Sequence, residues 1–142
     1  MNKEQLINNI ASLADKWEGL TTEKQEDKVF EEYIELIEAK ESGNIEEIKK
    51  ELADVIITMV VLDRLRGGFN VDAFVKCVDL ISGSELLRSD INDDLIIYIV
   101  TKLNQTATQY NLNVWECLEY KYNIVANRKG EVVDGTFVKD SE

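Results

Sequence analysis

The run of residues 52–62, LADVIITMVVL, constrains the fold more than any other part of the sequence, because it is apolar nearly all round. A helix with apolar residues on every side must be surrounded by other elements, so this helix is expected at the centre of the fold. The chain contains no proline and only seven glycines. With so few residues that break helices, the helical spacing of the apolar residues predicts an all-α fold.

Helices are predicted along most of the chain from the spacing of the apolar residues. Short turns separate them, which indicates antiparallel neighbours and therefore a compact helical bundle, with a four-helix core and an additional N-terminal helix. Thr22 with Gln25, and Asn44 with Glu47, are expected to cap two of these helices. The expected helices span residues 2–17, 22–41, 45–66, 71–81, 85–88, 95–110 and 114–128.

One all-α domain is expected over residues 1–130, followed by a C-terminal tail over residues 131–142. A chain of 142 residues is long enough to bury a sizeable core in a single domain. In the tail, Asp134-Gly135 stands between two short β-prone runs. This pattern predicts either a short C-terminal hairpin or a disordered tail, since an isolated hairpin is marginally stable.

The formal net charge of −12 argues against a duplex nucleic acid as partner and is compatible with cation binding. Histidine is absent, which removes the usual neutral-pH base and the commonest transition-metal ligand. No apolar run reaches transmembrane length, and the first residues do not resemble a signal peptide. Cys77 and Cys117 show no metal-ligand spacing. These features predict a cytoplasmic protein with reduced thiols and no membrane partner.

Asp54 is the exception in the apolar run, because a buried carboxylate must be paired, hydrogen-bonded, metal-bound or neutralised. Glu51 lies one turn before it on the same helix face, and Glu32 and Glu35 form a similar pair on the preceding helix. If the two helices pack antiparallel, the two acidic pairs face each other and repel. A divalent cation such as Mg²⁺, which prefers hard oxygen ligands, would relieve that repulsion.

The alternative is a solvated helix face, which is the usual meaning of an EExxE pattern on an exposed helix. Glu35 by itself also fits this interpretation, whereas Asp54 does not, because a plain core helix would carry no acid there. From spacing alone both interpretations stay open. The solvated interpretation is preferred for Glu31, Glu38, Glu41, Glu46 and Glu47.

The acidic pattern resembles the signature of the MazG-like and dimeric dUTPase-like all-α nucleoside triphosphate pyrophosphatases. It reads EEYIE at residues 31–35, then fifteen residues, then ELAD at residues 51–54. The resemblance implies Mg²⁺-dependent hydrolysis of a ribo- or deoxyribonucleoside triphosphate to the monophosphate and pyrophosphate, by metal-activated water attack at the α-phosphorus. It further implies a house-cleaning role in nucleotide metabolism and a homo-oligomer, either a dimer or a tetramer.

The same resemblance assigns roles to the acids. Glu32, Glu35, Glu51 and Asp54 would be the ligands of Mg²⁺, with Mn²⁺ as a substitute. Glu31 and Glu35 would be the catalytic acids that polarise water or accept its proton.

The resemblance also implies that basic residues of this chain would bind the triphosphate. Lys28 lies one turn before Glu32, where relatives often carry a phosphate-contacting lysine, although an ordinary Lys28–Glu32 surface pair explains it equally well. Lys121 and Arg128 are seven residues apart on one helical face and would neutralise the triphosphate. Their alternative role is compensation of the helix dipole.

The contacts to the base and sugar are less clearly marked. Relatives often carry an asparagine four residues after the lysine, where this chain has Val125. Asn123 and Asn127 lie near that position, and Asn127 is the candidate for this contact. Trp17 is a candidate for stacking on the base, and a core position is its alternative.

Three other protein classes are alternatives to this one. A ferritin-like di-iron bundle needs Glu-x-x-His pairs, which a chain without histidine cannot supply. A non-catalytic acidic helical interaction protein fits the net charge, but it predicts acids spread over the surface. A degenerate homologue that binds nucleotides without turnover also stays open.

Overall fold

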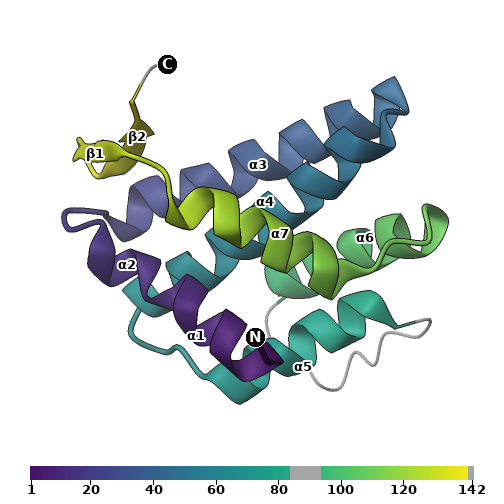
Figure 1. Cartoon of the computed structure of the whole chain (residues 1–142), viewed down its shortest axis with the longest axis horizontal. Coiled ribbons are helices and arrows are strands. Elements are labelled where there is room, and N and C mark those ends of the chain that lie inside the picture. Colours follow the sequence, from purple (N-terminus) through teal and green to yellow (C-terminus); the bar gives the residue numbers. More distant parts are fainter. Residues whose placement is uncertain (84–93, 141–142) are drawn as a thin grey trace.

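The computed structural model describes residues 1–83 and 94–140, and within them it is helical apart from one short hairpin (Figure 1). The expected all-α helical bundle is thereby confirmed, and of the two alternatives for the tail the short hairpin is the one that forms. None of the described helices is long and apolar enough to cross a membrane. The elements are α1 (Lys3–Ala11), α2 (Leu13–Lys16), α3 (Thr22–Ser42), α4 (Ile45–Leu65), α5 (Val71–Ser82), α6 (Asp94–Gln109), α7 (Val114–Ala126), β1 (Gly130–Val133) and β2 (Thr136–Lys139).

Helix α4 is the central element, as the apolar run predicts. It packs against α1, α2, α3 and α7, while α5 packs against α6, α1 and α7. Every residue from 52 to 62 is buried except Asp54, which is half-buried. The core therefore forms around α4, and Asp54 lies at its edge.

The turn between α3 and α4 is built by local chemistry. Gly43 adopts a positive φ of 73° and ends α3, a conformation that glycine reaches without steric cost. Asn44 follows as the N-cap of α4, and its side chain accepts the Glu47 backbone N–H at 3.2 Å. The expected cap at Asn44 is confirmed. This two-residue connection turns the chain back, so that α3 and α4 pack against each other as neighbours.

The expected cap at Thr22 is wrong by one residue. Thr21 is the N-cap of α3, because its backbone is extended and its Oγ1 accepts the Lys24 N–H at 3.3 Å. The Thr21 N–H in turn donates to the Gly135 carbonyl at 3.0 Å. That long-range bond to the hairpin is a tertiary contact, which the local pattern around Thr22 does not contain.

Two other helix boundaries also differ from the prediction. The N-terminal helix is interrupted at Ser12, whose hydroxyl donates to the Asn8 carbonyl at 2.9 Å, a bond of the kind that bends helices. Helix α7 ends at Ala126 with Asn127 as its C-cap, two residues before Arg128. The helix expected over residues 85–88 lies outside the described residues.

The C-terminal hairpin lies beside α2 and the start of α3 (Figure 1). Its strands pair antiparallel, with Val133 opposite Thr136. Asp134 and Gly135 both have positive φ, the conformation of a two-residue hairpin turn. A Cβ at Gly135 would lie 2.6 Å from the Thr21 Oγ1, so the hairpin tip contacts the cap of α3 too closely for a side chain. The tail is thus ordered through residue 140, while the domain division at residue 130 stays a prediction.

Candidate metal centre

The packing of α3 against α4 brings the two predicted acidic pairs to one pocket of about 400 Å³. Glu32 and Glu35 reach it from α3, and Glu51 and Asp54 reach it from α4. In each pair the two residues are three apart, which places both on one face of their helix. The acids that the sequence pattern selects therefore line a single cavity.

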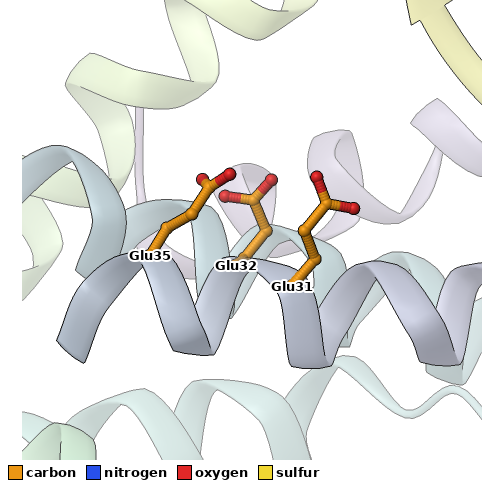
Figure 2. Close-up of side chains that lie close together, drawn as sticks. All are labelled: Glu31, Glu32 and Glu35. Atoms are coloured by element: carbon orange, nitrogen blue, oxygen red, sulfur yellow. The ribbon is translucent and has the colours of Figure 1, made fainter. Parts of the chain in front are cut away.

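Glu32 is the centre of this carboxylate cluster. One oxygen each of Glu32, Glu51 and Asp54 lie within 4.8 Å of one another, across the α3–α4 interface. A second group with the same spacing is formed by Glu31, Glu32 and Glu35 along α3. Figure 2 shows the three glutamates of α3 extending from the same side of the helix. Glu32 belongs to both groups, and only 8% of it is exposed.

Burial and mutual repulsion disfavour the charged form of these acids. The pKa of Glu32 is raised to about 7, first by burial and then by the charge of Asp54. The same two causes raise the pKa of Glu51 to about 8. The pKa of Asp54 is also raised, because its burial outweighs the opposing effect of Lys121. Without a cation, burial and mutual repulsion therefore favour protonation within this cluster.

Two carboxylate oxygens of the cluster lack partners. The Oε2 atoms of Glu32 and Glu51 are buried and have no hydrogen-bond partner. A buried acceptor without a partner costs free energy, and native proteins rarely keep one without a reason. Mg²⁺ and related divalent cations bind several hard carboxylate oxygens at short range. The donor chemistry and the unpartnered oxygens therefore fit a divalent cation at this site.

Lys121 forms an ion pair with Asp54. Its Nζ lies 3.3 Å from the Asp54 Oδ2, and the whole residue is buried. It lies inside α7, whose last turn contains no basic residue, so compensation of the helix dipole does not explain it. Arg128 lines the same pocket beyond the end of α7.

Lys28 lines the pocket beside the acids of α3. Its Nζ lies 3.4 Å from Glu32 Oε1 and 3.6 Å from Glu31 Oε1. Burial lowers the pKa of Lys28, but these carboxylates outweigh it and raise the pKa overall. Lys28 therefore pairs with the acids of α3 and also lines the pocket, where its ammonium group can contact an anion.

Two predicted site residues are not among those that line the pocket. Glu31 is exposed, and it lies beside the pocket residues Lys28 and Glu32. Asn127 is exposed, and its Nδ2 donates to the Asn123 carbonyl at 2.7 Å as part of the α7 C-cap. By contrast, Trp17 lines the pocket and stacks on Phe137, with ring centroids 4.2 Å apart.

Sequence reasoning missed several residues of this pocket. Gln25 and Thr58 continue the helical faces of Glu32 and Asp54, so their spacing of seven and four residues was an available signal. They also contact each other, because Gln25 Nε2 donates to the Thr58 carbonyl at 3.1 Å. The hairpin residues gave no such signal, since only tertiary packing brings them here. The missed lining residues are Gln25, Ile57, Thr58, Val61, Val125, Thr136, Phe137 and Lys139.

The fold and this pocket define an all-α protein with a carboxylate cluster on two packed helices and a buried lysine opposite. Residues 20–79 match the family model described as the MazG nucleotide pyrophosphohydrolase domain. This match confirms the resemblance seen in the sequence. The matched segment includes all of α3 and α4, and therefore all four carboxylates of the cluster. No curated protein and no solved structure matches the chain significantly.

Proposed function

We propose that this protein is a Mg²⁺-dependent nucleoside triphosphate pyrophosphohydrolase, which converts a ribo- or deoxyribonucleoside triphosphate to the monophosphate and pyrophosphate. The observation that carries the proposal is the carboxylate cluster around the buried Glu32, with unpartnered oxygens on Glu32 and Glu51 and a buried lysine beside Asp54. The MazG match supports the nucleotide pyrophosphohydrolase class. A role in removing unwanted nucleotides from the cytoplasmic pool is part of the proposal.

Glu32, Glu35, Glu51 and Asp54 would hold Mg²⁺, with Mn²⁺ as a substitute. When bound, the cation supplies Lewis acidity and neutralises charge on the phosphates. The carboxylates themselves position it, because α3 and α4 hold two acids each on facing surfaces. Binding also provides partners for the buried oxygens that otherwise have none.

Hydrolysis needs a group that accepts a proton from the attacking water. The water oxygen forms a bond to the α-phosphorus, and the bond from that phosphorus to the bridging oxygen breaks, which releases pyrophosphate. Glu35 lines the pocket and is our first candidate for the proton acceptor. Glu31 is exposed and paired with Lys28, so we propose an auxiliary role for it.

The cationic side chains would accommodate the polyphosphate. Lys121 is buried and oriented by Asp54, so it offers a fixed positive group close to the acids. Lys28 and Arg128 line the same pocket from α3 and from the segment after α7. Such a site stabilises charge without requiring these side chains to reorganise during the reaction.

An acidic interaction protein is the weaker alternative. It calls for acids spread over the surface, whereas Glu32 is buried and Asp54 is paired inside a pocket. No observation favours that function over hydrolysis. A homologue that binds nucleotides without turnover differs from our proposal only in activity, so it is decided by experiment.

The proposal predicts pyrophosphate release from some member of a panel of ribo-, deoxyribo- and modified nucleoside triphosphates. Release should require Mg²⁺ or Mn²⁺ and stop with EDTA, because the carboxylates alone cannot bind the polyphosphate. A coupled pyrophosphate assay measures it. Nucleotide binding without release from any member would identify a degenerate homologue, and neither binding nor release would favour an interaction protein.

We also propose that the protein forms a homo-oligomer, because α3 carries an apolar face on the outside of the fold. Phe30, Ile34 and Ile37 follow helical spacing on the side away from the core, with 44%, 54% and 41% of each residue exposed. Tyr98 of α6 is 52% exposed and packs edge-on against Tyr33 of α3. Contiguous exposed apolar surface of this kind is typical of protein interfaces.

Ile34→Lys is therefore expected to shift the protein to the single-chain mass in light scattering after size-exclusion chromatography. A lysine at the centre of the outer apolar face would have to be desolvated without a designed partner. Ile124→Lys is the matched control, since Ile124 is 39% exposed on α7 and lies off that face. A wild-type chain that elutes as a single copy at all concentrations would contradict the oligomer.

A further inference from the structure

The C-terminal hairpin forms one wall of the carboxylate pocket. Thr136, Phe137 and Lys139 of β2 line it together with the acids of α3 and α4. These residues lie far outside the segment matched by the family model, which ends at residue 79. The hairpin is therefore a feature of this chain that the family match leaves unexplained.

The pocket has two chemically different ends. Along α3, Gln25 and Glu35 both line it and are ten residues apart, which corresponds to about 15 Å along the helix axis. The four carboxylates occupy the end near Glu35. The hairpin contacts the other end, because Gly135 accepts a hydrogen bond from Thr21, the N-cap of α3.

The end next to the hairpin suits an aromatic, weakly polar group. Trp17 and Phe137 stack there with 20° between their planes. Val61 adds apolar surface, and the Gln25 carboxamide is fixed by its bond to the Thr58 carbonyl. A ring system stacks favourably on such a surface, and nucleobases do so whatever their sequence identity.

We propose that the C-terminal hairpin is a substrate-recognition element, in which Phe137 and Trp17 together bind the nucleobase while the carboxylate end binds the polyphosphate. This inference rests on the proposed pyrophosphohydrolase function. The ring centroids of Trp17 and Phe137 are 4.2 Å apart, a single stacking interval, so a base does not fit between them. The base lies against the pair from the pocket side.

The hairpin is held firmly enough for this role. Thr21 N–H donates to the Gly135 carbonyl at 3.0 Å, and Asp140 N–H donates to the Lys129 carbonyl at 2.8 Å beyond the strand ends. A Cβ on Gly19 would already contact Val132 at 3.3 Å, which reflects close packing of β1 on the α2–α3 connection. Phe137 is therefore positioned before the substrate arrives.

Lys139 adds a positive group from the same strand. It is exposed, it lines the pocket, and it is two residues from Phe137, so both side chains leave the strand on the same face. We assign it to the open side of the pocket, where it attracts the anionic substrate without fixing its position.

Calorimetric titration tests the inference with two probes, nucleoside monophosphates and inorganic pyrophosphate, each with Mg²⁺. Phe137→Ala should weaken the binding of a monophosphate roughly 5- to 100-fold and leave pyrophosphate binding unchanged, because only the monophosphate carries a base. Phe137→Leu keeps apolar contact with Trp17 and should shift monophosphate affinity in the same direction by less. Thermal unfolding of each variant establishes that it is folded.

Val138→Ala is the matched control, since Val138 lies on the same strand, is exposed and does not line the pocket. It should leave both affinities unchanged. Equal loss of both probes in the two folded Phe137 variants, or no loss of either, would overturn the recognition role. If the wild type binds pyrophosphate but no monophosphate, the hairpin inference fails alone. If it binds neither probe, the proposed function fails as well.

Discussion

Asp54→Asn is expected to lower Mg²⁺-dependent turnover roughly 100-fold or more, because it removes a charged oxygen from the cation site. The replacement keeps the shape of the side chain. It also removes one of several mutually repelling carboxylates, which offsets the loss of the charge beside Lys121. Steady-state kinetics of the best substrate from the triphosphate panel, with circular dichroism to establish the fold, measure the effect.

Glu46→Gln is the control for this change, since Glu46 is an exposed acid of the same helix that pairs with Lys49 at 3.4 Å and does not line the pocket. It should retain full turnover. Asp54 could instead serve only to orient Lys121. In that case Asp54→Asn would leave Mn²⁺ affinity, measured by calorimetry, at the wild-type value, and the cation-site assignment would be wrong.

The second large effect concerns stability without a cation. In EDTA, the protein should be more stable near pH 5 than near pH 8.5, which reverses the usual behaviour of paired carboxylates. The pKa values of Glu32 and Glu51 are raised in the fold to about 7 and 8, from an ordinary value of 4.5. Above pH 4.5 the unfolded chain loses these protons while the folded chain keeps them, so stability falls as pH rises through 7 and 8.

Mg²⁺ should restore the lost stability at about pH 8.5, where the carboxylates are free to bind it. At a concentration roughly 100-fold above the dissociation constant, the gain is about 2.7 kcal/mol, or on the order of 8 °C in melting temperature. Differential scanning calorimetry at the two pH values, with EDTA and with Mg²⁺, measures both effects. Glu32→Gln should reduce the dependence of stability on pH in EDTA, and it should remove most of the stabilisation by Mg²⁺. Equal melting temperatures in EDTA and Mg²⁺ at high pH would argue against a cation site.

Much of the fold could be predicted from the sequence, because apolar periodicity and helix caps are local patterns. The all-round apolar character of residues 52–62 predicted a central helix, and α4 is buried at each of these positions except Asp54. The Gly43-Asn44 turn predicted the antiparallel return of the chain, and both residues cap helices as expected. Spacing of three residues then sufficed to bring the acidic pairs to one pocket.

Features that depend on distant contacts were not predictable in this way. The N–H of Thr21, the N-cap of α3, donates to the carbonyl of Gly135 at the hairpin tip, a contact that no local pattern contains. Phe137 enters the pocket because it stacks on Trp17, which is 120 residues earlier in the chain. Such contacts leave no trace in local periodicity. The tail therefore read equally well as a hairpin or as disorder, although it forms part of the pocket wall.

Asp54, the acid that first indicated the site, also shows which features the sequence predicts and which it does not. Asp54 stood out because an apolar run cannot bury a carboxylate without a partner. Asp54 forms an ion pair with Lys121, which is 67 residues away in the sequence. From the sequence alone, Lys121 could equally have compensated the helix dipole. The spacing of the acidic residues identified the cluster, whereas the structure shows that the side chain of Lys121 pairs with Asp54.

The most direct test of the central claim is hydrolysis of a nucleoside triphosphate in ¹⁸O-labelled water, with Mg²⁺ and with EDTA, followed by mass spectrometry of both products. Attack at the α-phosphorus predicts label in the nucleoside monophosphate, none in pyrophosphate, and no products in EDTA. Label in the pyrophosphate, or turnover that persists in EDTA, would contradict the account of a metal-dependent pyrophosphohydrolase built on this carboxylate cluster.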